Sequence, residues 1–193
     1  MENKTILKNT LTWEEYSALF NDILTAEQPK SPYDNPEYLD YTKLNNSRLK
    51  RWMKTGEINE ELTAIITKIT EKQTWYVITE HWCGDAAHIL PFIYKMTELN
   101  DAIELKMILR DTEPYMIEDY LTNGGKSIPK IVIRNEKEED LYTWGPRPKE
   151  AQELYQKLVD EKADFEKMKI ELQKWYNADK GVKIQQEFIA LLK

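Results

Sequence analysis

The 193-residue sequence is poor in the side chains that build disulfides and metal sites, because it has one cysteine and two histidines. A single cysteine excludes an internal disulfide, and this usage is typical of the reducing cytoplasm, which is the location we expect. No apolar run approaches the roughly 20 residues that a membrane helix needs. The N-terminus leads into no apolar signal core, so secretion is not expected.

An excess of positive charge is also missing. The net charge is −7, which disfavours nucleic acid and anionic membranes as partners. Apolar residues make up 41% and charged residues 32% of the chain, which is typical of a globular protein. The length is ample for one well-packed domain with additions.

One stretch organises the chain: Glu80-His81-Trp82-Cys83-Gly84-Asp85-Ala86. An apolar run at 75–78 precedes it, and a segment with helical apolar spacing at 89–99 follows it. This order predicts a strand that feeds a helix, with the cysteine at their junction. Pro91 lies inside the expected helix and predicts a kink there.

The remaining pattern predicts a helical start, a four-stranded sheet and a helical end. Helices are expected at 13–24, with a capping box opened by Thr12, at 37–54, and after Asn59. Strands are expected at 74–80, 103–109, 131–133 and 141–144, the first two parallel and the last two an antiparallel hairpin. Apolar residues at spacings of three and four then predict one long helix from Lys149 to Gly181, and a short helix follows it.

Three landmarks together resemble the thioredoxin family over roughly residues 60–160. They are Trp82-Cys83-Gly84 between strand and helix, Ser127-Ile128-Pro129 just before a strand, and Gly145 after the second hairpin strand. The resemblance implies an α/β thioredoxin-like fold of bacterial type with a mixed sheet of about four strands. It also implies a cis peptide bond at Ile128–Pro129, with that loop facing the cysteine and presenting a backbone edge to an extended peptide. We expect a thioredoxin-like domain at 59–160, a helical N-terminal extension at 1–58 and a C-terminal one at 161–193.

The sequence departs from the family pattern at two functional positions. Ala86 stands where the family has its second cysteine, and Val77 stands where it has a buried acid. A lone thiol takes disulfide exchange only as far as a mixed disulfide, until an outside thiol resolves it. The leading hypothesis is therefore exchange through Cys83 alone, with a protein or a low-molecular-weight thiol or disulfide as partner.

The roles of the neighbouring residues follow from this hypothesis. We expect the helix N-terminus to lower the pKa of the Cys83 thiol. A protonated His81 would lower this pKa further, whereas the Asp85 carboxylate would raise it. Ala86 supports the site by filling the position of the absent cysteine. The residues expected to border the substrate are Trp82, Gly84, Asp85, Ile128 and Pro129.

Other readings of the same residues stay open. A redox-inactive adaptor would bind an extended peptide at the groove between Trp82 and Pro129. His81, Cys83 and His88 invite a metal site, but zinc usually takes four ligands and no second Cys/His cluster exists, so no metal or cofactor is expected. A cysteine-bridged iron–sulfur cluster of the glutaredoxin kind is an analogy only. The C-terminal apolar stripe would suit a homodimer, although packing against the N-terminal helices is favoured.

Overall fold

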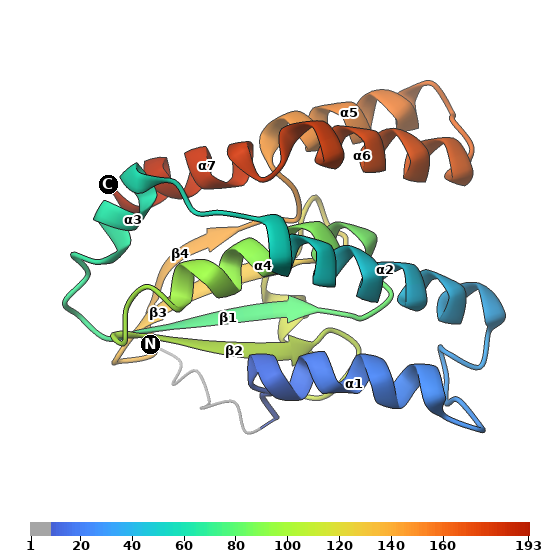
Figure 1. Ribbon diagram of the computed structural model, residues 1–193, viewed down its shortest axis with the longest axis horizontal. Helices are drawn as coiled ribbons and strands as arrows, with labels where there is room; N and C mark the ends of the chain where they lie inside the picture. The colour runs from blue at the N-terminus through green and yellow to red at the C-terminus, as the bar shows by residue number, and fades with distance from the viewer. Residues whose placement is uncertain (1–8) are drawn as a thin grey trace.

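The structure, a computed structural model, describes residues 9–193 and shows an α/β arrangement of helices around one sheet (Figure 1). The elements in chain order are α1 (Trp13–Thr25), α2 (Pro36–Thr55), α3 (Glu60–Ile66), β1 (Gln73–Thr79), α4 (Gly84–Thr97), β2 (Ile103–Leu109), the 3-10 helix η1 (Met116–Asp119), β3 (Lys130–Asn135), β4 (Asp140–Trp144), α5 (Lys149–Asp160), α6 (Phe165–Asp179) and α7 (Val182–Leu192).

The sheet has four strands in the order β2-β1-β3-β4, and it is mixed, as predicted. β1 and β2 are parallel, with Trp75 opposite Leu105, whereas β3 is antiparallel to both β1 and β4. The two central strands are apolar and β-branched, and Val77 and Ile131, which face each other across them, are fully buried. Runs without a polar face suit strands that are covered on both sides, as β1 and β3 are.

The N-terminal helix closes the outer side of β2. Leu11 and Met107 exchange two backbone hydrogen bonds, of 2.9 and 2.8 Å, so the edge of β2 is partly paired. α1 then starts at the predicted capping box, in which Thr12 Oγ1 accepts the Glu15 N–H and the Glu15 carboxylate accepts the Thr12 N–H. In Figure 1 this helix lies along the β2 side of the sheet.

α4 carries Cys83 as its N-cap residue and lies over the sheet, and α2 packs against it (Figure 1). Pro91 lies inside α4, and the helix continues through it to Thr97. α2 begins where Asn35 accepts the Glu37 N–H, with Pro36 at the first helical position, where a missing N–H costs nothing. Among residues 9–193, no helix combines the length and the apolar character that crossing a bilayer requires.

The prediction of one long C-terminal helix was wrong. The chain leaves the helical path after Asp160, and Lys162 takes a positive φ of 54°. Asp164 then caps a new helix by accepting the Lys167 N–H at 2.7 Å, and α6 packs back against α5. The polar residues Glu161 and Lys162 end the first helix, and Asp164 caps the second. The spacing of apolar residues does not reveal such a break by itself.

Gly181 separates α6 from α7, as predicted, and its φ is +80°. A Cβ atom at this position would lie 2.2 Å from the Phe92 ring, so only glycine fits. α7 packs against α3 and buries Ile184 and Phe188. The homodimer through the C-terminal helices stays a prediction.

Candidate functional site

Cys83 lies where the end of β1 turns into α4, next to the Ser-Ile-Pro loop. Its S–H donates to the backbone oxygen of Ile128 at 3.4 Å, and its Sγ accepts the Ala86 N–H at 3.5 Å. The Ile128–Pro129 peptide bond is cis, as predicted. The structure thus brings together the two motifs that the sequence places 45 residues apart.

The thiol is buried, and this reverses the expected direction of its pKa. Cys83 is only 5% exposed. The pKa of the thiol is raised to about 12, mainly by burial and secondly by the Asp85 carboxylate, while the Ala86 N–H and the Arg147 charge offset these causes only partly. We predicted a lowered pKa from the helix N-terminus. That prediction was wrong because the free energy lost when the thiolate is removed from water exceeds the stabilisation that the helix N-terminus provides.

His81 does not supply the positive charge that was predicted for it. Its ring stacks on Tyr16 with centroids 4.3 Å apart, and its Nε2 lies 2.9 Å from the Tyr16 backbone oxygen. The edge of the Phe20 ring closes another side. Burial lowers the pKa of His81 to about 4, so the ring is neutral at pH 7. His81 holds the loop on α1 and carries no charge for the thiol.

Asp85 is held from the opposite side of the loop. Its carboxylate forms an ion pair with Arg147 at 2.7 Å and accepts the Tyr176 hydroxyl at 2.8 Å. Asp85 and Arg147 are 11% and 13% exposed, respectively. Asp85 was predicted to border a substrate. It does line the open space described below, but its oxygens already bind groups of this chain.

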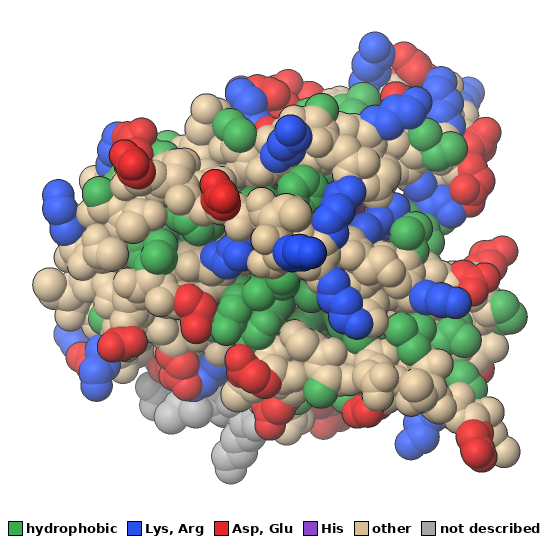
Figure 2. All heavy atoms as spheres, viewed as in Figure 1, with side chains coloured by type: hydrophobic (Ala, Val, Ile, Leu, Met, Phe, Trp, Pro, Cys, Tyr) green, Lys and Arg blue, Asp and Glu red, His purple; other side chains and the backbone are tan. Residues whose placement is uncertain are grey.

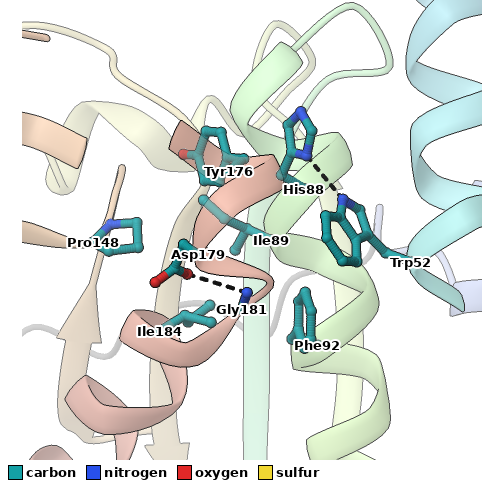
Figure 3. Close-up of a pocket in the computed structure, with 9 residues that line it drawn as sticks. All are labelled: Trp52, His88, Ile89, Phe92, Pro148, Tyr176, Asp179, Gly181 and Ile184. Carbon is teal, nitrogen blue, oxygen red and sulfur yellow. Dashed lines mark hydrogen bonds between the residues drawn. The ribbon is translucent and has the colours of Figure 1, made fainter. Parts of the chain in front are cut away.

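His88 lies between α2 and α6, where Figure 3 shows its ring between Trp52 and Tyr176, and it also lines the cleft described below. Its Nδ1 accepts the Trp52 indole N–H at 2.9 Å, so its Nε2 carries the proton and donates to Gln173 at 3.2 Å. The ring stacks on Tyr176, and burial lowers its pKa to about 3. The cavity drawn in Figure 3 is about 10 Å³, roughly the space of one water.

A metal at His81, Cys83 and His88 has no support in this geometry, because both nitrogens of His88 already bind side chains. Within residues 9–193, no three His, Cys, Asp or Glu side chains gather as a metal site would require.

A large cleft lies over Cys83, and the two helical extensions form its walls. Its volume is about 1030 Å³, at the upper end of the range of small-molecule sites. α2 lines one wall, α6 lines the other, and Cys83, Ile128 and their neighbours form the floor. Figure 2 shows Lys and Arg side chains gathered around the hollow between these helices. Trp82 borders it, with the Arg110 guanidinium 4.7 Å above its ring and the edge of Tyr38 against it.

Two residues of the N-terminal extension belong to the site and were missed from the sequence. Asn45, fully buried on α2, donates from its amide to the His81 backbone oxygen at 3.1 Å. Its side-chain oxygen accepts from Arg48 at 2.9 Å. A signal was present, because Asn45 lies four residues after Tyr41 and four before Leu49, on the same face of α2 as these two apolar side chains. A polar residue on such a face usually has a specific partner.

A family model described as thioredoxin matches residues 32–169. The match spans more than half of the chain, so the chain belongs to the thioredoxin family. No curated protein matches it.

Two solved structures share the fold over almost the whole chain. A protein of unknown function from Pseudomonas aeruginosa has 15% identity and a TM-score of 0.54, covering 94% of this chain and 97% of its own. An HIV epitope-scaffold protein has 14% identity and a TM-score of 0.55, covering 94% and 98%. At this identity the likeness concerns the fold, including the helical additions at both ends.

Proposed function

We propose that this chain is a ligand-binding member of the thioredoxin family, and that its cleft holds an extended, peptide-like segment over Cys83. The observation that carries the proposal is the cleft of about 1030 Å³, whose floor is the backbone beside Pro129. Within residues 9–193, the Ile128 N–H makes no backbone hydrogen bond. A free backbone donor beside an apolar and aromatic cleft suits the pairing of an extended peptide.

In this function Cys83 is a buried hydrogen-bond donor. Its S–H binds the Ile128 oxygen and so fixes the loop that the ligand meets. The thiol is protonated at neutral pH because burial raises its pKa to about 12. A serine in the same place keeps a donor of similar size, so binding does not require sulfur.

Binding is tested with a library of N-acetylated hexapeptides that lack cysteine, passed over the immobilised protein. We expect the wild type and Cys83→Ser to retain the same peptides. Met168→Trp, on the α6 wall, fills the cleft and should abolish retention. Ile170→Trp, on the same helix but exposed and outside the lining, is the matched control and should retain them. Retention of no peptide by the folded wild type, or equal retention by Met168→Trp, contradicts the proposal.

A second candidate is monothiol exchange through Cys83, in the reducing cytoplasm that the cysteine usage predicts. It is favoured by one observation, that Cys83 lies on the cleft floor at the start of α4, where a disulfide in a bound ligand would meet it. The Cys83 thiol would lose its proton to water, and the thiolate would attack one sulfur of the ligand disulfide. The other sulfur would leave as a thiolate and take up a proton. A second, external thiol would then break the mixed disulfide and restore Cys83.

The two candidates differ in how Cys83 reacts. If the thiol is a buried donor, its alkylation by iodoacetamide should be slow and should rise steadily from pH 6 to 9, because little thiolate exists in that range. A rate that levels off below pH 7, together with a mixed disulfide in the intact mass after incubation with glutathione disulfide, would favour exchange. Alkylation in urea, where the thiol is no longer buried, is the control for the reagent. Its rate should depend on pH as for an ordinary thiol with a pKa near 8.5.

A further inference from the structure

The cleft is lined by five cationic side chains, and four of them already have a carboxylate. Arg147 binds Asp85, Arg110 binds Asp111, Lys126 binds Glu118, and Lys169 binds Glu166. Arg48 is the exception, because within residues 9–193 no carboxylate lies within ion-pair distance of it. The chain as a whole carries an excess of negative charge, so a guanidinium in this cleft that forms no ion pair among residues 9–193 is not a consequence of composition.

Arg48 is held in place by Asn45 and Tyr41 on α2, but it forms no ion pair with any residue in the range 9–193. Its Nη1 donates to Asn45 at 2.9 Å, and its guanidinium lies over the Tyr41 ring at 5.6 Å. Its Nε is buried and has no hydrogen-bond partner among the residues that the structure describes. Burial lowers the pKa of Arg48, and Tyr41 and the more distant Asp85 carboxylate offset this lowering only partly. A partly buried charge that lacks an ion pair is costly, and such groups usually have a partner in the functional state.

The position of Arg48 connects it with the cysteine loop. A Cβ atom built on Gly84 would lie 3.6 Å from Arg48 Nη1 and 3.3 Å from the Tyr41 ring. Because Gly84 has no side chain, the guanidinium lies directly over the backbone next to Cys83. The carboxylates on the same wall, Glu37 and Asp40, lie at the start of α2, two turns or more from Arg48. The wall is therefore negative at one end and positive beside Cys83.

We propose that Arg48 is a carboxylate-binding residue of the cleft and that the ligand is an anionic peptide-like molecule with its carboxylate beside Cys83. This inference rests on the binding function proposed above. A guanidinium is suited to a carboxylate because it offers several N–H donors in one plane and stays charged when partly buried. The carboxylate belongs either to the end of a peptide or to an Asp or Glu side chain, and the two sources are separable by experiment.

Three cysteine-free hexapeptide libraries, all N-acetylated, make the test. The first ends in a free carboxylate and contains no Asp or Glu, the second is identical but ends in an amide, and the third ends in an amide but contains Asp and Glu. We expect the immobilised wild type to retain the first or the third at least 10-fold more than the second. Preference for the first identifies a terminal carboxylate, and preference for the third identifies a side-chain carboxylate.

The preference should depend on Arg48 and not on charge elsewhere on α2. Arg48→Gln removes the charge and keeps an amide that can donate to Asn45, so it should lose the 10-fold preference while remaining folded. Arg48→Lys keeps the charge and should retain part of the preference. Arg51→Gln is the matched control, because Arg51 lies on the same helix, binds Asn177 and does not line the cleft. It should behave as the wild type does.

The outcomes separate this inference from the proposed function. Equal retention of all three libraries by the wild type would overturn the carboxylate site and leave peptide binding intact. An unchanged preference in Arg48→Gln would overturn the role of Arg48. Retention of none of the libraries would overturn peptide binding itself, and the carboxylate site with it.

Discussion

The two ends of the Cys83 loop are fixed by different kinds of interaction: neutral contacts at His81 and an ion pair at Asp85. Upstream, His81 is fixed by neutral contacts, namely the stacked Tyr16 ring, its backbone oxygen and the amide of Asn45. Downstream, Asp85 is fixed by a mostly buried ion pair with Arg147 and by the Tyr176 hydroxyl. The upstream contacts come from α1 and α2, and the downstream contacts from α6 and the turn before α5. The comparison shows that both helical extensions serve the same loop.

This double attachment explains the state of the thiol. The helices that hold the loop also cover it, so Cys83 becomes the floor of a cleft instead of an exposed tip. The same burial that raises the pKa of the thiol lowers the pKa of His81 to about 4. Neither group is charged at neutral pH, and the charged side chains near the loop include Asp85, Arg147, Arg48 and Arg110.

The largest expected effect is the loss of the downstream ion pair. Arg147→Met leaves the Asp85 carboxylate buried with one partner fewer, and should lower the free energy of unfolding by about 3–5 kcal/mol. Urea denaturation measures this change. Adding Asp85→Asn to the variant removes the uncompensated charge and should restore a good part of the loss. A cost below about 1 kcal/mol for Arg147→Met would show that the pair is solvated and the comparison mistaken.

A smaller effect is expected for the second partner of the same carboxylate. Tyr176→Phe removes the hydroxyl that donates to Asp85 and keeps the ring stacked on His88. Hydrogen bonds to charged groups contribute about 1.5–3 kcal/mol, and a loss in this range is expected in urea denaturation. Tyr142→Phe, on the exposed face of β4, is the control and should change little. An equal loss of unfolding free energy in Tyr176→Phe and Tyr142→Phe would contradict a stabilising hydrogen bond between Tyr176 and Asp85.

On the upstream side, a neutral replacement should be tolerated. His81→Phe keeps an aromatic ring against Tyr16 and loses one hydrogen bond to the Tyr16 oxygen. It also removes Nδ1, which is buried and has no partner within residues 9–193. The two changes oppose each other, so we expect a loss of about 1 kcal/mol or less at pH 7. A loss as large as that of Arg147→Met would mean that the two ends are equally dependent on polar contacts.

At neutral pH the effect of His81 is small, but the same position should also change how stability depends on pH. The pKa of His81 is lowered to about 4 in the folded chain, so between pH 6.5 and 4 the unfolded chain binds the extra proton. Stability is therefore lost as the pH falls through this window. His81→Phe should reduce the slope by about 1.4 kcal/mol per pH unit. Burial raises the pKa of Glu80 to about 7, which gives a slope of opposite sign in both proteins and cancels in the difference. An unchanged slope would contradict the buried, neutral His81.

Much of the fold could be predicted from local signals. The capping box at Thr12, the β-branched runs of the central strands and the glycine at position 181 each act within a few residues, and each appears where predicted. The cis-proline loop was identified by resemblance and lies against Cys83. The break between α5 and α6 was missed although Glu161 interrupts the apolar stripe there, because the spacing resumes at Phe165 and the capping role of Asp164 was not recognised.

The candidate site was only half predictable. The residues of the loop were named from the motif, whereas Asn45, Arg48 and Tyr176, which lie far from it in sequence, were not. Their roles depend on which helix covers the loop, and no local pattern encodes that. For the same reason the direction of the Cys83 pKa was predicted wrongly, since the helix end is local and the burial is not.

By itself, the sequence determined the order of strands and helices, the presence of a single thiol and the motif around it, because these follow from short-range propensities and residue identity. Only the tertiary structure decided that the thiol is enclosed and protonated and that a guanidinium with no ion pair in the described part of the chain lies beside it. Burial and charge pairing are properties of segments that meet across the fold, and desolvation acts on whatever those segments enclose.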